Sequence, residues 1–307
     1  MKNFIRKAYA FIFSICLLVP AFALGNKEDA GVFKDRAGNQ VELPTKIEKI
    51  AVFAPSTFKI VDGLGLKNKV IAVDTYSADT DTSLKELPAF DMMKPDTEKI
   101  IALNPDLIFT TGMSKAGGKD PFKPVREAGI CVLDIPTSTS FDAIYEDIEF
   151  IASALGVRQK GVKMADGIKK EIEKYKKIAN TIPAEKRKTV YVEIGAPPYL
   201  YSTGKNTYMN EALEIIGAKN IFADQEGWIS ISEEQVLAKN PDIILTQVHY
   251  IDQPVENVKT REGWNVIKAV KNNNVYLINA DYLAQPCQHI VKGVEEIAKF
   301  IYPEYFK

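Results

Sequence analysis

One twelve-residue pattern occurs twice in the chain, first as Thr97-Glu98-Lys99-Ile100-Ile101-Ala102-Leu103-Asn104-Pro105-Asp106-Leu107-Ile108 and, 136 residues later, as Glu233-Glu234-Gln235-Val236-Leu237-Ala238-Lys239-Asn240-Pro241-Asp242-Ile243-Ile244. Each copy predicts a helix that starts near the Glu, ends at the Asn because proline disfavours the α conformation of its predecessor, and is followed by a strand. A generic helix-to-strand joint could have the same pattern. The long offset instead favours two homologous lobes.

Strand and helix patterns alternate on both sides of these copies. Short β-branched runs predict strands at 50–53, 70–73, 107–110 and 131–135, then at 190–194, 243–246 and 275–278, with a last helix at 290–301. Alternation of this kind is typical of parallel sheets covered by helices. We therefore predict an α/β fold with two similar Rossmann-like lobes.

The region from 141 to 182 has no strand pattern, and its apolar residues keep helical spacing, with Gly156 as a possible interruption. A hairpin is predicted at 31–44, around the turn residues 35–39. The predicted parts are a signal peptide at 1–25, an N-terminal lobe at 26–155, a connecting helix at 156–182 and a C-terminal lobe at 183–307.

The first 25 residues predict export. Lys2, Arg6 and Lys7 precede an apolar run of about 12 residues, too short to span a bilayer as a helix, and small residues follow it. We expect a cleaved, periplasmic protein. We expect no lipid anchor, because Cys16 follows Ile15 in the middle of the run rather than a small residue at its end.

Composition indicates a soluble protein with a sizeable core, since the chain has 307 residues of which 46% are hydrophobic. Cleavage would remove three positive charges and change the formal net charge from −1 to −4, which gives no sign of nucleic-acid binding. Cys131 and Cys287 would be the only cysteines left, and we expect both to be free thiols.

The chain resembles the periplasmic substrate-binding proteins of ABC importers for iron siderophores, haem and cobalamin. The resemblance runs over nearly the whole mature chain and rests on the order of its parts: the 35–44 hairpin, Ile50-Ala51-Val52-Phe53-Ala54-Pro55-Ser56, Gly63-Leu64-Gly65, both copies of the repeat, Trp264-Asn265-Val266-Ile267-Lys268-Ala269-Val270-Lys271, and Glu295-Glu296-Ile297-Ala298. It implies one rigid helix between two lobes, a ligand cleft between them, and modest closure.

The resemblance also implies one exposed Glu on each lobe that docks on basic residues of the permease. The matching positions are Glu98 and Glu234. An acid in the first turn of a helix also complements the helix dipole, and Ser232 with Gln235 could form a capping box. The two roles are compatible. The implied partners are a small-molecule ligand and a permease dimer with its ATPase subunits, and we expect a monomer.

Ligands of open α/β sheets bind beyond the carboxyl ends of the strands. That rule selects Ser56, Thr57, Tyr76, Met113, Ser114 and Thr137 in the first lobe, and Tyr199, Tyr201, Trp228, His249, Tyr250, Tyr282, Gln285, Cys287 and His289 in the second. Aromatic rings with polar tips suit a macrocycle or an aromatic chelate. We favour Tyr76, Tyr250 and Tyr282 and expect about half of the set to line the cleft.

Two features bear on the ligand's chemistry. Many relatives have an Arg-rich segment where this chain has Ala284-Gln285-Pro286-Cys287-Gln288-His289, which disfavours a strongly anionic siderophore. The only two histidines, His249 and His289, fall in predicted cleft loops and could contact a metal or haem, with Met113 as an axial partner from the other lobe. Ordinary hydrogen bonding is the alternative for each histidine.

We expect no intrinsic cofactor and no enzyme. The chain has no phosphate-binding Gly-Lys-Ser/Thr loop, no His-Glu-x-x-His and no Gly-x-Ser-x-Gly pattern, and too few cysteines for an iron–sulfur cluster. An exported metal or haem carrier, or a sensor, that is not coupled to a permease is the alternative function. The bound cargo would be a metal chelate or a metal-containing macrocycle, and haem, cobalamin, a weakly charged siderophore and a small metal complex all remain open.

Overall fold

The computed structural model describes residues 33–115 and 117–307. The predicted signal peptide, including Cys16, lies outside this part of the chain. Its first element is the predicted hairpin, formed by the antiparallel strands β1 (Phe33–Lys34) and β2 (Gln40–Val41). Asp35 closes the turn, because its Oδ1 accepts hydrogen bonds from the backbone N–H groups of Ala37 and Asn39.

The N-terminal half contains a parallel sheet in the order β5-β4-β3-β6-β7. Its strands are β3 (Ile50–Val52), β4 (Val70–Asp74), β5 (Ala89–Phe90), β6 (Leu107–Thr111) and β7 (Cys131–Ile135). The intervening helices are α1 (Pro55–Gly63), α2 (Thr75–Thr80), α3 (Thr97–Leu103) and α4 (Lys123–Glu127), with 3₁₀ turns η1 (Lys67–Lys69), η2 (Thr82–Leu84) and η3 (Gly112–Lys115). The predicted strands of this half are confirmed.

The C-terminal half repeats this arrangement in a parallel sheet ordered β10-β8-β12-β13. Its strands are β8 (Thr189–Glu193), β10 (Lys219–Asn220), β12 (Ile243–Thr246) and β13 (Val275–Leu277). The helices are α7 (Tyr208–Ile215), α8 (Glu233–Lys239), α9 (Pro254–Lys259), α10 (Lys268–Lys271), α11 (Ala280–Leu283) and α12 (Ile290–Ile301), with 3₁₀ turns η4 (Ala184–Lys186) and η5 (Trp264–Val266). Strands β4-β3-β6-β7 thus correspond to β10-β8-β12-β13, which confirms two similar lobes.

The two copies of the sequence repeat have the same backbone geometry. Helix α3 ends at Asn104 and α8 at Asn240, and both asparagines adopt the left-handed conformation, with φ of 49° and 44°. The Asp after each Pro accepts a hydrogen bond from the backbone of the neighbouring central strand. Asp106 accepts from Lys49 N, just before β3, at 2.8 Å. Asp242 accepts from Thr189 N, at the start of β8, at 2.9 Å. The repeat therefore encodes a helix stop and a tie to the adjacent strand.

Alternate residues of the central strands face different helices, as the two-residue period of a strand requires. In β3, Ile50 and Val52 are fully buried in a cluster with α1 and α5 (Phe141–Ala154), whereas Ala51 packs in a second cluster with residues of α3 and α4. Burial on both faces explains why these strands are continuously apolar in sequence. The first cluster continues without interruption into the C-terminal half, through α7 and α12.

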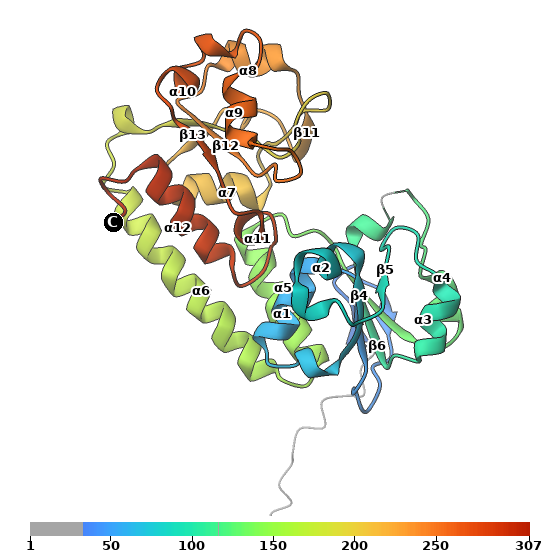
Figure 1. The fold of residues 1–307 in the computed structure, drawn as a ribbon. Coiled ribbons are helices and arrows are strands. Elements are labelled where there is room, and N and C mark those ends of the chain that lie inside the picture. The colour runs from blue at the N-terminus through green and yellow to red at the C-terminus, as the bar shows by residue number, and fades with distance from the viewer. Residues whose placement is uncertain (1–32, 116) are drawn as a thin grey trace, which may run out of the picture. The chain divides into compact units, whose positions relative to one another are not determined.

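The predicted helical region between the lobes forms two helices. Helix α5 ends at Ala154 and α6 (Arg158–Ala179) begins four residues later, because Gly156 lies between them with φ of 72°. The two helices pack closely at Gly161, where an added Cβ would lie only 2.4 Å from Ala152 Cβ. Figure 1 shows α6 running beside α12 of the C-terminal half. The long connecting helix is thus 22 residues long.

One two-stranded element was not predicted. Strands β9 (Tyr201–Thr203) and β11 (Trp228–Ser230) pair antiparallel, with Trp228 opposite Thr203. Tyr201 and Trp228 were expected in loops, because three-residue strands are too short to show a two-residue period. Among the described residues, no helix is long and apolar enough to cross a membrane.

Candidate functional site

A cavity of about 510 Å³ is lined by residues of both halves of the chain. Its lining residues are Ala54, Pro55, Ser56, Thr57, Ile60, Tyr76, Met92, Thr111, Met113, Ile135, Pro136, Thr137, Ser138, Asp147, Ile151, Ile194, Tyr201, Tyr208, Met209, Trp228, Gln247, Ala284, Gln285 and Pro286. Most of these residues follow the carboxyl ends of strands or lie on the helices that pack beside them. The cavity is therefore the cleft that both sheets share.

The central strands of each sheet explain this position. In each sheet, the strands that follow the first central strand are added on one side of it and the later strands on the other side. The switch lies between the neighbouring strands β3 and β6 in one sheet and between β8 and β12 in the other. A crevice forms outside the carboxyl ends of the strands at such a point. The registers Ile50–Leu107 and Val190–Ile243 make Ala54 equivalent to Ile194 and Thr111 equivalent to Gln247, and all four residues line the cavity.

Aromatic and sulfur-containing side chains dominate the wall in the C-terminal half. Tyr208 and Trp228 contact each other edge to face, with ring centroids 5.5 Å apart. The Tyr208 hydroxyl donates to the carbonyl of Ala284 at 2.9 Å, which fixes the ring against the segment that precedes α12. Flat apolar rings with satisfied polar tips offer contact area to a planar ligand at low entropic cost.

One lining residue carries a formal charge, and that charge is already paired. Asp147 on α5 accepts from Arg36 Nε at 2.6 Å and from the Ser138 hydroxyl at 2.7 Å. Burial raises the pKa of Asp147, although its bonds to Ser138 and Arg36 act in the opposite direction. Lys, Arg and His are absent from the described residues that line the cavity. The wall therefore offers no free cation to an anionic ligand.

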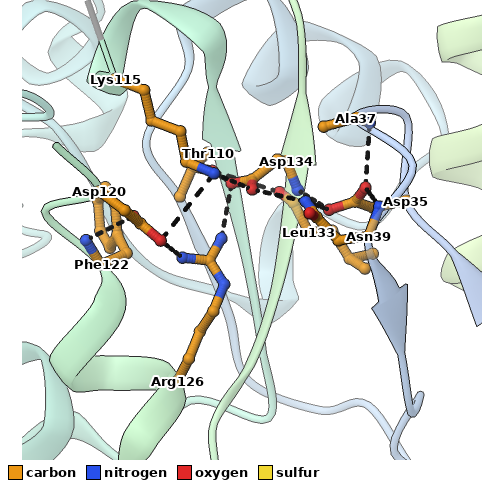
Figure 2. A network of polar contacts seen from close by, with 10 residues as sticks. All are labelled: Asp35, Ala37, Asn39, Thr110, Lys115, Asp120, Phe122, Arg126, Leu133 and Asp134. Atoms are coloured by element: carbon orange, nitrogen blue, oxygen red, sulfur yellow. Dashed lines mark hydrogen bonds and ion pairs between the residues drawn. The ribbon is translucent and has the colours of Figure 1, made fainter. Parts of the chain in front are cut away.

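A polar network supports the loop that brings Met113 to the cavity (Figure 2). Asp134 on β7 is buried and accepts hydrogen bonds from Lys115 of η3, from Arg126 of α4 and from the Thr110 hydroxyl. Its backbone N–H also donates to Asp35 of the hairpin at 3.0 Å. Burial raises the pKa of Asp134, but the hydrogen bonds from Lys115 and Thr110 and the charge of Arg126 outweigh it and keep the pKa below its usual value.

The structure places the predicted site residues in two groups. On the cavity wall lie Ser56, Thr57, Tyr76, Met113, Thr137, Tyr201, Trp228 and Gln285. Away from it lie Ser114, Tyr199, His249, Tyr250, Tyr282, Cys287 and His289. Of the three tyrosines that the sequence favoured, Tyr76 is on the wall. Tyr250 is 64% exposed, and its hydroxyl oxygen accepts a hydrogen bond from Ala196 N at 3.0 Å. Ligand contact by each wall residue stays a prediction.

Neither histidine reaches the cavity. His249 is exposed, and its Nδ1 lies 3.2 Å from the Gln247 carbonyl oxygen. His289 is half-buried against the edge of Tyr282, and its pKa is lowered, mainly by burial and then by the nearby charges of Lys292 and Lys59. Among the described residues, no three His, Cys, Asp or Glu side chains gather closely enough to hold a metal ion. Cys131 and Cys287 are free thiols, and burial raises the pKa of each to about 11.

Sequence reasoning missed several wall residues, notably Met92, Tyr208, Met209, Gln247 and Asp147. Gln247 directly follows β12 and could have been found by the same carboxyl-end rule that selected His249, two residues later. Tyr208 and Met209 open α7, where their apolar character indicates ordinary core packing. Asp147 lies inside a helix, at a position that no strand-end rule selects.

Glu98 and Glu234 are both exposed in the first turns of their helices. In α8, Ser232 and Gln235 form the predicted capping box, with Gln235 Oε1 accepting from Ser232 N at 2.9 Å. The pKa of Glu234 is lowered, chiefly by a hydrogen bond from Ser232. In α3 the cap is Asp96, which accepts from Lys99 N. Neither glutamate serves as the cap, so both carboxylates remain available to a partner.

Known proteins are similar to this chain in sequence and in fold. Residues 50–282 match the model of a family described as periplasmic binding protein. An ABC transporter substrate-binding lipoprotein of Bacillus subtilis, YvrC, is 36% identical over 89% of this chain and 86% of its own length. A vitamin B12-binding protein of Vibrio cholerae is 27% identical over 84% of this chain and 90% of its own.

The solved structures agree. A possible iron-binding, periplasmic solute-binding protein from Staphylococcus epidermidis superposes with a TM-score of 0.72 at 28% identity, covering 84% of this chain and all of that one. The chain thus belongs to the periplasmic binding protein family, whose two-lobed α/β fold, with a long helix between the lobes, it shares. The family is one of substrate-binding proteins of ABC transporters, as the resemblance in sequence implied.

Proposed function

We propose that this protein captures a metal-containing macrocycle or a weakly charged metal chelate in the shared cavity and delivers it to an ABC importer, with cobalamin as the first candidate. The composition of the cavity wall supports this ligand class. Among the described residues, the wall has aromatic, methionine and neutral polar side chains and no free cation. An anionic ligand would be desolvated there without a partner, which is costly.

The chemistry of this wall supports one class among the ligands that the sequence left open. Haem carries two propionates and many siderophores are anionic, and both are best bound beside arginine. A corrin such as cobalamin presents neutral amides around a large flat ring. The vitamin B12-binding relative from Vibrio cholerae supports the same choice. We propose that the chain needs no intrinsic cofactor and performs no catalysis.

A titration of the purified mature protein tests the ligand. We expect cyanocobalamin to bind at one site, with haem and ferric chelates binding more weakly, as measured by isothermal titration calorimetry and by the absorption of each chromophore. Trp228→Ala should weaken binding, whereas His249→Ala, outside the cavity, should leave it unchanged. Binding of haem alone, with loss on His249→Ala, would contradict the proposal.

Delivery to a permease dimer with its ATPase subunits is tested at the two exposed glutamates. We expect Glu98→Lys with Glu234→Lys to abolish uptake in cells while ligand affinity stays within about twofold. Glu86→Lys with Glu185→Lys is the matched control, since both residues are also exposed. Unchanged uptake after reversal at Glu98 and Glu234 would instead support a carrier or sensor that is not coupled to a permease.

We propose that the protein acts outside the cytoplasmic membrane as a monomer, with its first 25 residues removed. The expectation that it lacks a lipid anchor falls on residues outside the described part of the chain, and the Bacillus subtilis relative is named a lipoprotein. Mass spectrometry of the N-terminus of the native protein decides the matter: cleavage near residue 25 without added mass supports a free protein, and an acylated Cys16 overturns it.

A further inference from the structure

Two glutamines on the cavity wall have carboxamide oxygens to which no group in the described part of the chain donates a hydrogen bond. Gln247 follows β12 and is 9% exposed, and Gln285 follows α11 and is 6% exposed. In both, Oε1 is buried and without a hydrogen-bond partner among the described residues. A buried acceptor that is left unpaired destabilises the folded protein, because it has lost its hydrogen bonds to water without replacement. Buried polar atoms are nearly always hydrogen-bonded. The missing donors would therefore come from a molecule bound in the cavity.

The orientation of the Gln285 carboxamide is determined by its neighbour. Its Nε2 donates to Asp281 Oδ1 at 3.1 Å, and an ionised carboxylate can only accept. The nitrogen therefore faces Asp281, and the oxygen is the free acceptor. Tyr76, which belongs to the other half of the chain, also lies close to Gln285. The pKa of the Tyr76 hydroxyl is raised, mainly by burial and then by the charge of Asp281, whereas a hydrogen bond with Gln285 lowers it.

Gln247 is held by its backbone and not by its side chain. Its N–H donates to the Glu193 carbonyl at 3.0 Å, which fixes the residue at the carboxyl end of the two central strands. The described residues make no hydrogen bond to its side chain, and the last torsion of a glutamine is soft. The carboxamide can therefore turn to present either its oxygen or its NH₂ group to a molecule in the cavity.

We propose that Gln247 and Gln285 form a neutral hydrogen-bonding subsite that selects ligands bearing amide or hydroxyl donors and rejects the same ligands when those groups are carboxylates. The inference rests on the proposed function, since it assumes a ligand in this cavity. The Gln285 oxygen, which is held as an acceptor, would repel a carboxylate, and the neutral carboxamide of Gln247 adds no positive charge to offset the cost of desolvating one. Asp281, which Gln285 contacts, is also negative, and Arg36 is paired with Asp147.

The experiment compares two corrins of the same shape. Dicyanocobinamide carries primary amides, and dicyanocobyrinic acid carries carboxylates at the corresponding positions. We expect the wild-type protein to bind the amide form at least ten times more tightly at pH 7.5, as measured by calorimetry. Gln247→Met and Gln285→Met keep the volume but remove the hydrogen bonds, so each should weaken amide binding about 3- to 10-fold and narrow the gap between the two corrins.

Charge variants provide the second measurement. Gln247→Glu and Gln285→Glu still accept hydrogen bonds, so the preference for the amide corrin should widen rather than narrow. Gln159→Glu adds the same charge at an exposed position on α6 and should change neither affinity. Circular dichroism and urea unfolding verify that each variant is folded.

The outcomes separate this inference from the proposed function. If the wild type binds a corrin but the Met variants match it for both ligands, the glutamine subsite is overturned and the function stands. Binding of haem or a ferric chelate alone also overturns the subsite. If the wild type binds no corrin, haem or ferric chelate, the proposed function itself fails.

Discussion

The two sheets share one strand order but bury their carboxylates on different strands. Thr110 and Thr246 occupy equivalent positions near the ends of β6 and β12, and each donates its hydroxyl to a buried acid. In the N-terminal half that acid is Asp134, on the outer strand β7; in the C-terminal half it is Glu193, on the central strand β8. The backbone repeat has been retained while the polar partners at the carboxyl ends have changed.

The position equivalent to Glu193 illustrates this change. It is Phe53, whose ring stacks on Phe122 at 5.4 Å inside an apolar cluster. Glu193 is instead paired with Arg261, whose guanidinium lies over the Trp264 ring at 4.6 Å. The same backbone position thus serves as apolar packing in one half and as half of an ion pair in the other. The helix-to-strand joint tolerates no such change, because Asn104 and Asn240 both need the left-handed conformation.

The largest effect is expected at the more deeply buried pair. Arg261 and Glu193 have side chains that are 7% and 1% exposed. Glu193→Ala leaves the guanidinium without its partner, and we expect a loss of about 3–5 kcal/mol in the free energy of unfolding. Urea denaturation monitored by circular dichroism measures it. The double variant Glu193→Leu with Arg261→Met should recover most of the loss, and a loss below about 1 kcal/mol in the single variant would contradict this account.

A smaller effect is expected at Asp134. Its partners Lys115 and Arg126 are 36% and 28% exposed, so water can solvate them when the acid is removed. Asp134→Ala should therefore cost about 1–3 kcal/mol, less than Glu193→Ala. If Asp134→Ala and Glu193→Ala lost equal free energies of unfolding, the exposure of the paired cations would not explain the difference between the two ion-pair networks.

The same acid gives a pH dependence. The folded protein lowers the pKa of Asp134 below 3.8, so this stabilisation is complete above that pH and is lost as the pH falls through the folded pKa. We expect wild-type stability to fall more steeply below about pH 4 than that of Asp134→Asn. Urea midpoints between pH 7 and pH 3 test this, and parallel curves would refute it.

The two halves should also contribute unequally to ligand affinity. Trp228 packs against Tyr208 on the wall, whereas Met113 is 56% exposed. Central, well-packed aromatic residues account for most binding energy in interfaces. We expect Trp228→Ala to weaken binding of the identified ligand roughly 10-fold or more, and Met113→Ala to weaken it only about 3-fold. Calorimetry with both variants measures the ratio, and a reversed order would assign the dominant wall to the N-terminal half.

The smallest expected effect on stability is a difference between the asparagines that end the helices in the two copies of the repeat, Asn104 and Asn240. Asn240 Oδ1 accepts from Lys268 N at 2.9 Å. Glycine adopts the left-handed conformation without strain, so Asn104→Gly should change the free energy of unfolding by less than about 0.5 kcal/mol. Asn240→Gly also loses the hydrogen bond from Lys268 N, so it should lower the free energy of unfolding by about 1 kcal/mol. Differential scanning calorimetry can compare the two variants with wild type.

Much of the fold was predictable because its determinants are local in sequence. The β-branched runs predicted β7 and β12 at their observed bounds. The last helix, α12, was also predicted at its observed bounds, and Gly156 predicted the break between α5 and α6. The presence of two similar lobes followed from the repeat, since both copies adopt the same joint. Strands β9 and β11 escaped prediction because three residues are too few to show alternation.

The candidate site was predictable only in part. The carboxyl-end rule found Ser56, Thr57 and Thr137, because these residues directly follow strands. The rule could not tell which way a side chain points within a loop, so it selected His249 and missed Gln247, two residues earlier. Residues such as Asp147, on a helix, reach the cavity only through the packing of α5.

The sequence by itself determined the two-lobe α/β plan, the family and the edge of each sheet where the cavity lies, because apolar periodicity, helix stops and chain order are encoded in consecutive residues. The tertiary structure decided which side chains meet at that edge. It placed Trp228 beside Tyr208, paired Arg36 with Asp147, and left the carboxamide oxygens of Gln247 and Gln285 without a donor among residues 33–115 and 117–307. Contacts of this kind join residues that are distant in sequence, and they arise only when elements from both halves pack around a shared core.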